Sequence, residues 1–158
     1  MGTQKPIQRT FDERCEYVSS VLQDAGNRLT KSRREAIRVL CSADAPMSIQ
    51  DLHEEVVRTA SSDLSTQYRL MNELQRLDLV KAVEMRGQPN PGYVVHLPGE
   101  SNDLLVCTKC GQYAWLEEAA EIRRLEERIA KKMKFGKLSH ELRLNGVCEP
   151  CQETPDPA

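Results

Sequence analysis

Residues 106–111 read VCTKCG, and residues 146–151 read GVCEPC. Each segment carries two cysteines separated by two residues, and the four are Cys107, Cys110, Cys148 and Cys151. Two thiolates at this spacing can chelate one metal ion from a tight turn, and two such turns supply the four sulfurs that structural Zn²⁺ prefers. Two disulfides or a redox-active C-x-x-C pair are the alternatives. The pattern favours one structural zinc ion per chain.

The composition bears on these alternatives. The chain has 158 residues and a net charge of −2, with no run of eighteen apolar residues and no apolar segment near its start. We therefore expect a soluble, cytoplasmic protein with no membrane partner, in a compartment where disulfides rarely persist. The other two cysteines, Cys15 and Cys41, fall in helical patterns and are either small core residues or reactive thiols.

Residues 12–97 predict four helices followed by a hairpin. Good N-caps precede three of the helical patterns, at Thr30, Ser48 and Asp63. The turn-rich segment 86–91 then joins two strand-like segments, 80–85 and 92–97. Apolar residues at helical spacing are expected to face the core: Ile37, Leu40, Cys41, Ile49, Leu52, Val56 and Val57. This order of elements is that of a winged helix-turn-helix.

The fourth predicted helix has two different faces. One side collects the apolar residues Leu64, Leu70, Met71, Leu74 and Leu77. The other side collects Ser65, Arg69, Asn72 and Arg76, with Tyr68 at its edge. A recognition helix needs such a polar stripe to contact base edges and phosphates, although an ordinary solvated face looks similar. Glu73 also lies on the polar side and disfavours phosphate.

Local charge favours the recognition helix over an ordinary solvated face, although a solvated helix start can also be basic. Five basic residues against one acid, Glu35, give residues 28–38 a charge of +4 in a chain that is acidic overall. The basic residues are Arg28, Lys31, Arg33, Arg34 and Arg38. Such a patch beside the fourth helix would supply the phosphate contacts that position a protein on duplex DNA.

After residue 100 the pattern changes to strand, strand, helix and strand. The expected strands flank the first cysteine pair within 103–116, the helix spans 117–135, and the last strand lies within 137–148. A domain of this size has little core of its own, so zinc and dimerisation are expected to stabilise it. The fold class is therefore α+β: a winged-helix domain over 1–99, with 1–10 flexible, a small α/β dimerisation domain over 100–152, and a disordered tail over 153–158.

The chain resembles the ferric uptake regulator (Fur) family of bacterial metal-responsive transcription factors. The resemblance runs from about Leu22 to Cys151 and rests on four segments: RLTKSRREAIRVL, STQYRLMNELQRLDLV, LLVCTKCG and HELRLNGVCEPC. It implies a homodimer whose winged helices bind an AT-rich palindromic operator on double-stranded DNA. It also implies a C-terminal dimerisation domain that holds structural zinc.

Residue by residue, the resemblance implies a DNA-binding surface. Tyr68 and Arg69 match the pair that reads DNA, Arg28 matches a basic residue that enters the minor groove, and Arg33 matches an arginine near the phosphates. The predicted surface also includes the rest of the stripe, Ser65, Asn72 and Arg76, together with Thr66. The four cysteines match the structural zinc ligands.

The usual sensory metal site is the main departure from the family. The segment 97–107 before the first cysteine pair holds no histidine. Family histidine and glutamate ligands are replaced by Met47, Val94 and Trp115. Only Asp103 and His140 remain as a residual sensory site, and His140 is either a metal ligand or a hydrogen-bonded histidine of the domain core. An alternative ligand set would draw on His96, Glu100 or Glu121.

Three functional classes follow. The favoured one is a sequence-specific DNA-binding regulator that acts as a repressor, without the usual regulatory metal site and without enzymatic activity. A zinc-stabilised helix-turn-helix that binds protein instead of DNA is the alternative. A thiol oxidoreductase is disfavoured, because no acid/base residue accompanies the paired cysteines. Salt-dependent binding to duplex DNA separates the first two classes.

Overall fold

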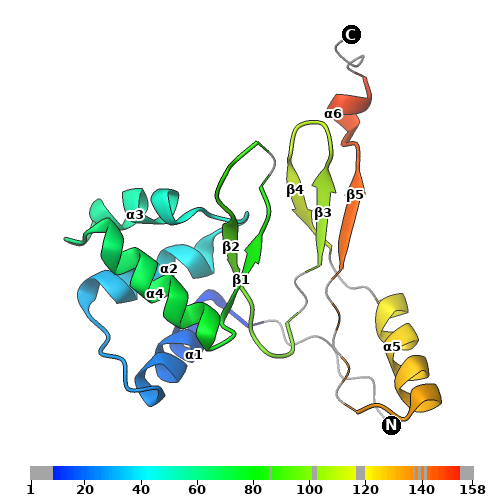
Figure 1. The fold of residues 1–158 in the computed structure, drawn as a ribbon, viewed down its shortest axis with the longest axis horizontal. Helices are drawn as coiled ribbons and strands as arrows, with labels where there is room; N and C mark the ends of the chain where they lie inside the picture. Colours follow the sequence, from blue (N-terminus) through cyan, green and yellow to red (C-terminus); the bar gives the residue numbers. More distant parts are fainter. Residues whose placement is uncertain are drawn as a thin grey trace. The chain divides into compact units, whose positions relative to one another are not determined.

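In the computed structural model, the chain forms two compact units, residues 7–100 and residues 101–158 (Figure 1). The structure describes residues 9–85, 87–100, 103–116, 120–136, 138, 140 and 142–153. Of the predicted flexible segment 1–10, only Arg9 and Thr10 are described, and Thr10 caps the first helix. The predicted tail lies outside the described residues from 154 onward.

The first unit begins with four helices whose starts are fixed by local side-chain chemistry. They are α1 (Phe11–Asp24), α2 (Lys31–Ser42), α3 (Ile49–Val57) and α4 (Leu64–Arg76). Thr30, Ser48 and Asp63 each accept a hydrogen bond from the backbone N–H three residues on, as predicted. Thr10 and Glu13 form a reciprocal capping box at α1, with Thr10 N donating to Glu13 Oε2 at 2.7 Å.

A hairpin completes the first unit. Strands β1 (Val80–Val83) and β2 (Gly92–Val95) pair antiparallel and are shorter than the predicted segments. Tyr93 also exchanges two backbone hydrogen bonds with Met47, of 2.8 and 3.0 Å, which ties the hairpin to the α2–α3 connection. A Cβ at Gly92 would lie 2.7 Å from Met85 Sδ and from Pro46 Cβ, so only glycine fits there. The arrangement is a winged helix-turn-helix.

The core of this unit lies between the four helices and the hairpin. Its fully buried side chains include Leu22, Ile37, Leu52, Val56, Leu70, Met71, Leu74 and Leu97. Two predicted core positions are wrong: Val57 is 46% exposed and Leu64 is also exposed. Val57 is the last residue of α3 and points about 100° round the helix from the buried Val56. Leu64 lies in the first turn of α4, about 90° round the helix from the packed face of α4.

The second unit is a three-stranded sheet with one long helix. Its sheet contains β3 (Leu104–Cys107), β4 (Tyr113–Trp115) and β5 (Arg143–Gly146), in the order β4-β3-β5. Strand β4 pairs antiparallel to β3, and β5 pairs parallel to β3 after α5 (Ala120–Met133). The last strand is shorter than predicted, and the short helix α6 (Glu149–Gln152) was not predicted.

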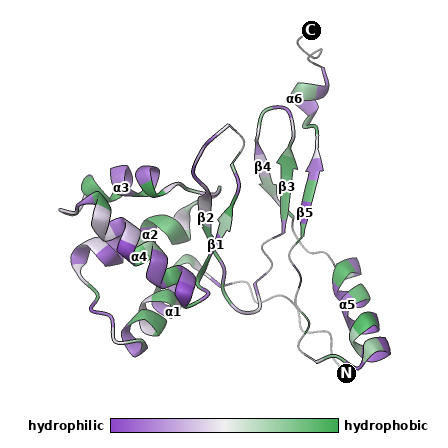
Figure 2. Ribbon diagram, viewed as in Figure 1, coloured by the Kyte–Doolittle hydropathy of each residue, from purple (hydrophilic) through white to green (hydrophobic). Residues whose placement is uncertain are grey.

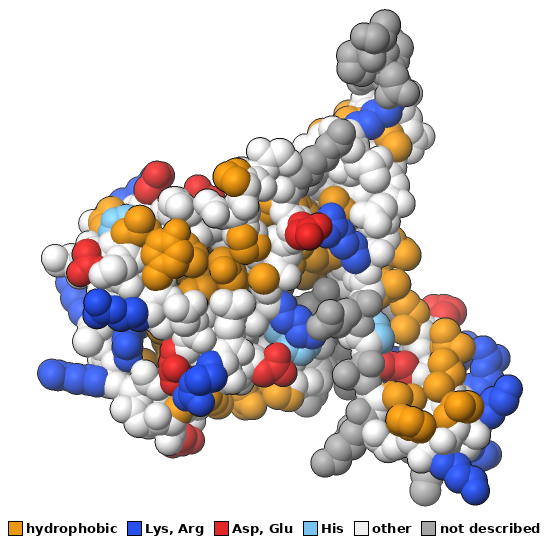
Figure 3. Space-filling model, in the orientation of Figure 1, with side chains coloured by type: hydrophobic (Ala, Val, Ile, Leu, Met, Phe, Trp, Pro, Cys, Tyr) orange, Lys and Arg blue, Asp and Glu red, His pale blue; other side chains and the backbone are white. Residues whose placement is uncertain are grey.

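The apolar side of α5 is uncovered in the single chain. Leu125 and Ile129 are each 42% exposed, Met133 more so, and no described residue of α5 is buried. Figure 2 shows that α5 carries both hydrophobic and hydrophilic residues. Apolar side chains also gather over α5 on the face drawn in Figure 3. An amphipathic helix with an exposed apolar face favours a partner surface, which agrees with the dimerisation expected here. Within the described part of the chain, no helix has the length and apolar character needed to span a membrane.

Candidate metal centre and nucleic-acid interface

The parallel pairing of β3 with β5 brings the two cysteine pairs together. Its register places Cys107 opposite Gly146, and Thr108 N donates to Gly146 O at 2.7 Å. After β3 the chain turns through residues 108–110. Gly111 completes this turn with a φ of +78°, which glycine adopts without strain. The second pair sits at the start of α6. Both pairs therefore lie at the same end of the sheet.

The four cysteine sulfurs form one compact cluster. Cys107, Cys110, Cys148 and Cys151 have sulfur atoms that all lie within 4.8 Å of one another. The Sγ atoms of Cys110 and Cys148 are 3.6 Å apart, close to the roughly 3.8 Å edge of a tetrahedron with Zn–S bonds of about 2.3 Å. All six cysteines of the chain are free thiols. The donor set fits a structural zinc site.

The electrostatics of the cluster also suit a divalent cation. Backbone N–H groups of Cys110 and Cys148 donate to Cys107 Sγ, and they lower the pKa of its thiol to about 5. The side-chain hydrogen bond with Cys148 raises the pKa of the Cys151 thiol to about 12. Four neighbouring sulfurs cannot all be thiolates without a compensating positive charge, which Zn²⁺ supplies.

Helix α4 presents the predicted polar stripe to solvent. Ser65, Arg69, Asn72 and Arg76 are all exposed, and Tyr68 at the stripe's edge is 40% exposed. Leu70, Met71 and Leu74 on the opposite side are fully buried. Thr66 is half-buried on the first turn, where its N–H donates to the Asp63 carboxylate. Helix α4 therefore packs against the core through its apolar side, and its polar side is exposed to solvent.

The predicted phosphate contacts lie beside this stripe. Arg28 is exposed and Arg33 is half-buried. Arg33 Nη1 donates to Arg28 O at 3.1 Å and to Asn27 Oδ1 at 3.3 Å. Asn27 Nδ2 in turn donates to Glu73 Oε1 of α4 at 2.9 Å. The start of α2 is thereby joined to α4 by a chain of hydrogen bonds.

A buried amide beneath the stripe was missed by sequence reasoning. Gln67 is fully buried, and its Nε2 donates to Ser62 Oγ at 2.8 Å and to Ser32 Oγ at 3.3 Å. These bonds anchor α4 to α2 and to the turn before α4. The signal in the sequence was helical spacing, because Gln67 lies three, four and seven residues before Leu70, Met71 and Leu74.

The structure brings Asp103 and His140 together and adds Glu126. His140 Nε2 lies 3.1 Å from Asp103 Oδ2, and His140 Nδ1 lies 2.8 Å from Glu126 Oε1. Burial alone lowers the pKa of His140, but the hydrogen bonds to Glu126 and Asp103 raise it above the ordinary value for histidine. Both ring nitrogens thus face carboxylates. Glu126 could have been suspected as an acid on the apolar side of α5.

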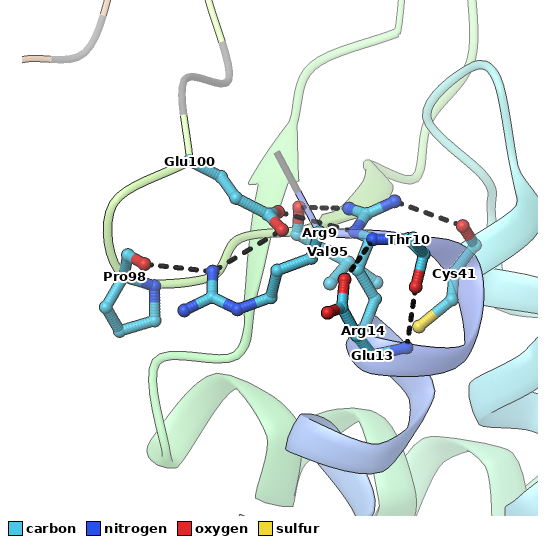
Figure 4. Close-up of polar contacts among 8 residues, drawn as sticks. All are labelled: Arg9, Thr10, Glu13, Arg14, Cys41, Val95, Pro98 and Glu100. Carbon is cyan, nitrogen blue, oxygen red and sulfur yellow. Dashed lines mark hydrogen bonds and ion pairs between the residues drawn. The ribbon is translucent and has the colours of Figure 1, made fainter. Parts of the chain in front are cut away.

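A second missed cluster ties α1 to the end of the first unit. The carboxylate of Glu100 lies 3.3 Å from Arg14 Nε and 3.5 Å from Arg9 Nη1 (Figure 4). Arg9 also donates to Pro98 O at 3.0 Å, and Arg14 to Cys41 O at 3.0 Å. The Glu100 side chain is largely buried between the two guanidinium groups. This carboxylate has charged partners of its own.

The other replaced family positions are divided between the two units. Val94 is buried in β2, opposite Lys81 of β1. Met47 is half-buried against the core of the first unit, while Trp115 is half-buried in β4 of the second unit. Cys15 and Cys41 contact each other across α1 and α2, and burial raises the pKa of both thiols. They are therefore core residues with little thiolate at neutral pH.

Known proteins resemble this chain over most of its length. Residues 24–145 match the model of the ferric uptake regulator family. The chain is 29% identical to the ferric uptake regulation protein of Legionella pneumophila over 139 residues, 85% of this chain and 98% of that protein. It is 26% identical to the corresponding protein of Campylobacter jejuni over 145 residues, 89% of this chain and 90% of that protein.

Solved structures agree with the sequence matches. The Helicobacter pylori ferric uptake regulator superposes with a TM-score of 0.71 at 20% identity, over 96% of this chain and 99% of that one. A zinc-bound manganese uptake regulator superposes with a TM-score of 0.59 at 26% identity, over 83% of this chain and 98% of that one. Fold, paired cysteines and sequence agree, and the chain belongs to the ferric uptake regulator family of transcription regulators.

Proposed function

We propose that this protein is a homodimeric, cytoplasmic repressor that binds an AT-rich palindromic operator. The observation that carries the proposal is the exposed polar stripe of α4 on a helix whose back is fully buried. A helix held in this way can enter the major groove without losing its packing. The exposed apolar side of α5 supports a dimer, and a two-fold dimer matches a palindromic site.

The side chains divide into base-reading and phosphate-binding groups. Arg69, in the middle of the stripe, and Tyr68, at its edge, are assigned to the bases. The DNA-binding surface around them also includes Ser65, Thr66, Asn72 and Arg76. Arg28 is assigned to the minor groove, and Arg33 to the phosphates. Arg33 is held by Asn27 and the backbone, which suits a contact that positions the protein and does not read sequence.

One zinc ion per chain is assigned to Cys107, Cys110, Cys148 and Cys151. Four protein ligands leave no open position for a substrate, so the ion would supply stability instead of catalysis, consistent with a protein that is not an enzyme. The four sulfurs would cross-link the end of β3 to the start of α6. Because the second unit buries so little of α5, its folding depends on this cross-link and on dimerisation.

We further propose that DNA binding needs no regulatory metal. Both nitrogens of His140 face carboxylates, so a metal ion there would have to displace one of these hydrogen bonds. Glu100, a substitute ligand considered above, is held by Arg9 and Arg14. A metal that replaced one of these hydrogen bonds would keep His140 and one carboxylate as protein ligands, too few to hold Fe²⁺, Mn²⁺ or Zn²⁺ tightly enough to bias an open and a closed state.

A titration of duplex DNA tests both proposals. Protein carrying one zinc per chain is expected to bind a duplex that it enriches from a random-sequence pool, with an affinity that falls steeply with salt. Adding Fe²⁺, Mn²⁺ or further Zn²⁺ should change that affinity by less than tenfold, about 1.4 kcal/mol of coupling. No enrichment of any duplex would refute the DNA-binding assignment. A tenfold or greater gain with metal would refute the metal-independent one.

A further inference from the structure

An acid on the DNA-facing side of α4 has no role in the function proposed so far. Glu73 lies about 70° round the helix from the centre of the stripe, on the side opposite Tyr68. Its side chain is partly exposed. A carboxylate beside a phosphate-binding surface weakens binding to DNA unless it does something else. Its contacts indicate what that is.

Glu73 holds one of the stripe's own arginines. Arg76 Nε donates to Glu73 Oε2 at 3.0 Å, and Arg76 Nη2 donates to Glu73 Oε1, so the guanidinium pairs with both carboxylate oxygens. The two residues are three apart on α4, where side chains are neighbours. Arg76 is therefore directed toward Glu73 in the free protein.

Glu73 also faces the basic start of α2. Its Oε1 accepts from Asn27 Nδ2 at 2.9 Å, and Asn27 Oδ1 accepts from Arg33 Nη1 at 3.3 Å. Hydrogen bonds from Arg76 and Asn27 lower the pKa of the Glu73 carboxyl to about 2, so it is ionised wherever duplex DNA is stable. Glu73 therefore carries a negative charge between Arg76 and Arg33, two arginines assigned to the DNA-binding surface.

We propose that Glu73 is a specificity-determining residue that restrains binding to random DNA by withholding Arg76 and repelling the phosphate backbone. Affinity for random duplex depends on how many phosphates the protein neutralises, whereas discrimination depends on base contacts. On random duplex no base contact fixes the position of α4, so an Arg76 released from Glu73 can turn to the nearest phosphate, whereas on the selected site the base contacts fix α4 and the Arg76–Glu73 pair can stay intact. Glu73 thereby weakens random binding more than specific binding and raises the ratio between the two affinities, which is the quantity that selects one site in a genome. This inference rests on the proposed DNA-binding face.

The test compares Glu73→Gln with Glu55→Gln. Gln has the same length and can still accept from Asn27, but it lacks the charge. Glu55 is a matched control, because it pairs with Arg58 three residues on at 2.9 Å, but on α3 instead of the stripe. Each variant loses one negative charge, so a general effect of net charge appears in both. Glu73→Ala serves as a second variant, and unfolding curves confirm that each variant is folded.

Binding is measured for zinc-loaded dimers on two probes: the duplex that wild type enriches from a random-sequence pool, and the unselected pool. We expect E73Q to bind the unselected pool about threefold or more tightly than wild type. The ratio of specific to random affinity should fall by a similar factor. The slope of log affinity against log salt on the pool should steepen by about 0.9, one additional phosphate contact. E55Q should leave the ratio unchanged.

Each other outcome overturns a defined step. An unchanged ratio in E73Q, or an equal change in E55Q, overturns the role of Glu73. Weaker binding to both probes in E73Q and E73A means that Glu73 only supports the fold of the surface, which also overturns it. If wild type enriches no duplex at all, the proposed function fails before Glu73 is tested.

Discussion

Replacing His140 with glutamine separates a hydrogen-bonding histidine from a metal ligand. In wild type the imidazole bridges Asp103 and Glu126 with contacts of 3.1 and 2.8 Å. Gln cannot carry a positive charge and reaches only one of the two carboxylates well. Hydrogen bonds to charged partners contribute about 1.5–3 kcal/mol each when buried. Because the His140 side chain is 28% exposed, we expect a loss of about 1–2 kcal/mol for both together.

The pH dependence gives this prediction its sign. The pKa of His140 is raised in the folded protein, so its contribution is complete below the unfolded value of about 6.5. The contribution is lost as pH rises through the folded pKa. The stability difference between wild type and H140Q should therefore be largest near pH 5.5 and should shrink toward pH 8.5. A metal ligand would behave in the opposite way, because metal competes with protons for the ring.

Urea unfolding of zinc-loaded dimers at fixed protein concentration measures the difference. The chain has a single tryptophan, Trp115, which lies on β4 of the same unit and reports on its unfolding. His53→Gln, on α3 of the other unit, is the matched control for a histidine replacement. A stability difference between wild type and H140Q that stays constant across this pH range, or grows with pH, would refute the charged hydrogen bonds of His140 to Asp103 and Glu126.

Three further predictions follow from the two units. Cys148→Ser should lose the zinc and weaken the dimer, and less than half an equivalent of zinc in reduced, unchelated wild type would refute the site. Arg69→Ala should weaken binding to the enriched duplex by about 1–3 kcal/mol more than to random duplex, whereas Arg33→Ala should weaken both alike; equal losses for Arg69→Ala contradict the assignment. Leu70→Ala should cost about 2–5 kcal/mol of unfolding free energy, because Leu70 is fully buried in the core of the first unit. A cost below 1 kcal/mol by urea unfolding would contradict this packing.

Local chemistry made the first unit predictable. Thr30, Ser48 and Asp63 mark helix starts through bonds that span only three residues, so the sequence contains both partners. Packing direction was predicted less well, because Val57 and Leu64 are apolar but lie at helix ends where nothing covers them. The apolar character of a residue predicts that it is buried only in the middle of a helix, where residues of the neighbouring turns lie on the same packed face.

The long-range contacts could not be predicted from spacing. The cysteine spacing predicted that the two pairs meet, but the parallel register that aligns Cys107 with Gly146 depends on where α5 returns the chain. One partner of Gln67, Ser32 on α2, is 35 residues away in the sequence, and Arg14 contacts Glu100 from the opposite end of the first unit's sequence. Such polar contacts leave no periodic pattern, and only the packed structure brings the partners together.

The two clusters of the second unit hold its elements by different chemistry. The thiols gather sulfur donors that become a stable set only when a divalent cation compensates their charge. His140 instead connects Asp103, the residue before β3, to Glu126 of α5 through hydrogen bonds, and these bonds raise its pKa, so it takes up a proton more readily than an ordinary histidine. A bound metal can shift a conformational equilibrium only through different affinities for the two states. Hydrogen bonds to Glu126 and Asp103 raise the pKa of His140, so a metal at this position would compete with a proton for the ring, and that competition would reduce the free energy that the metal could gain there.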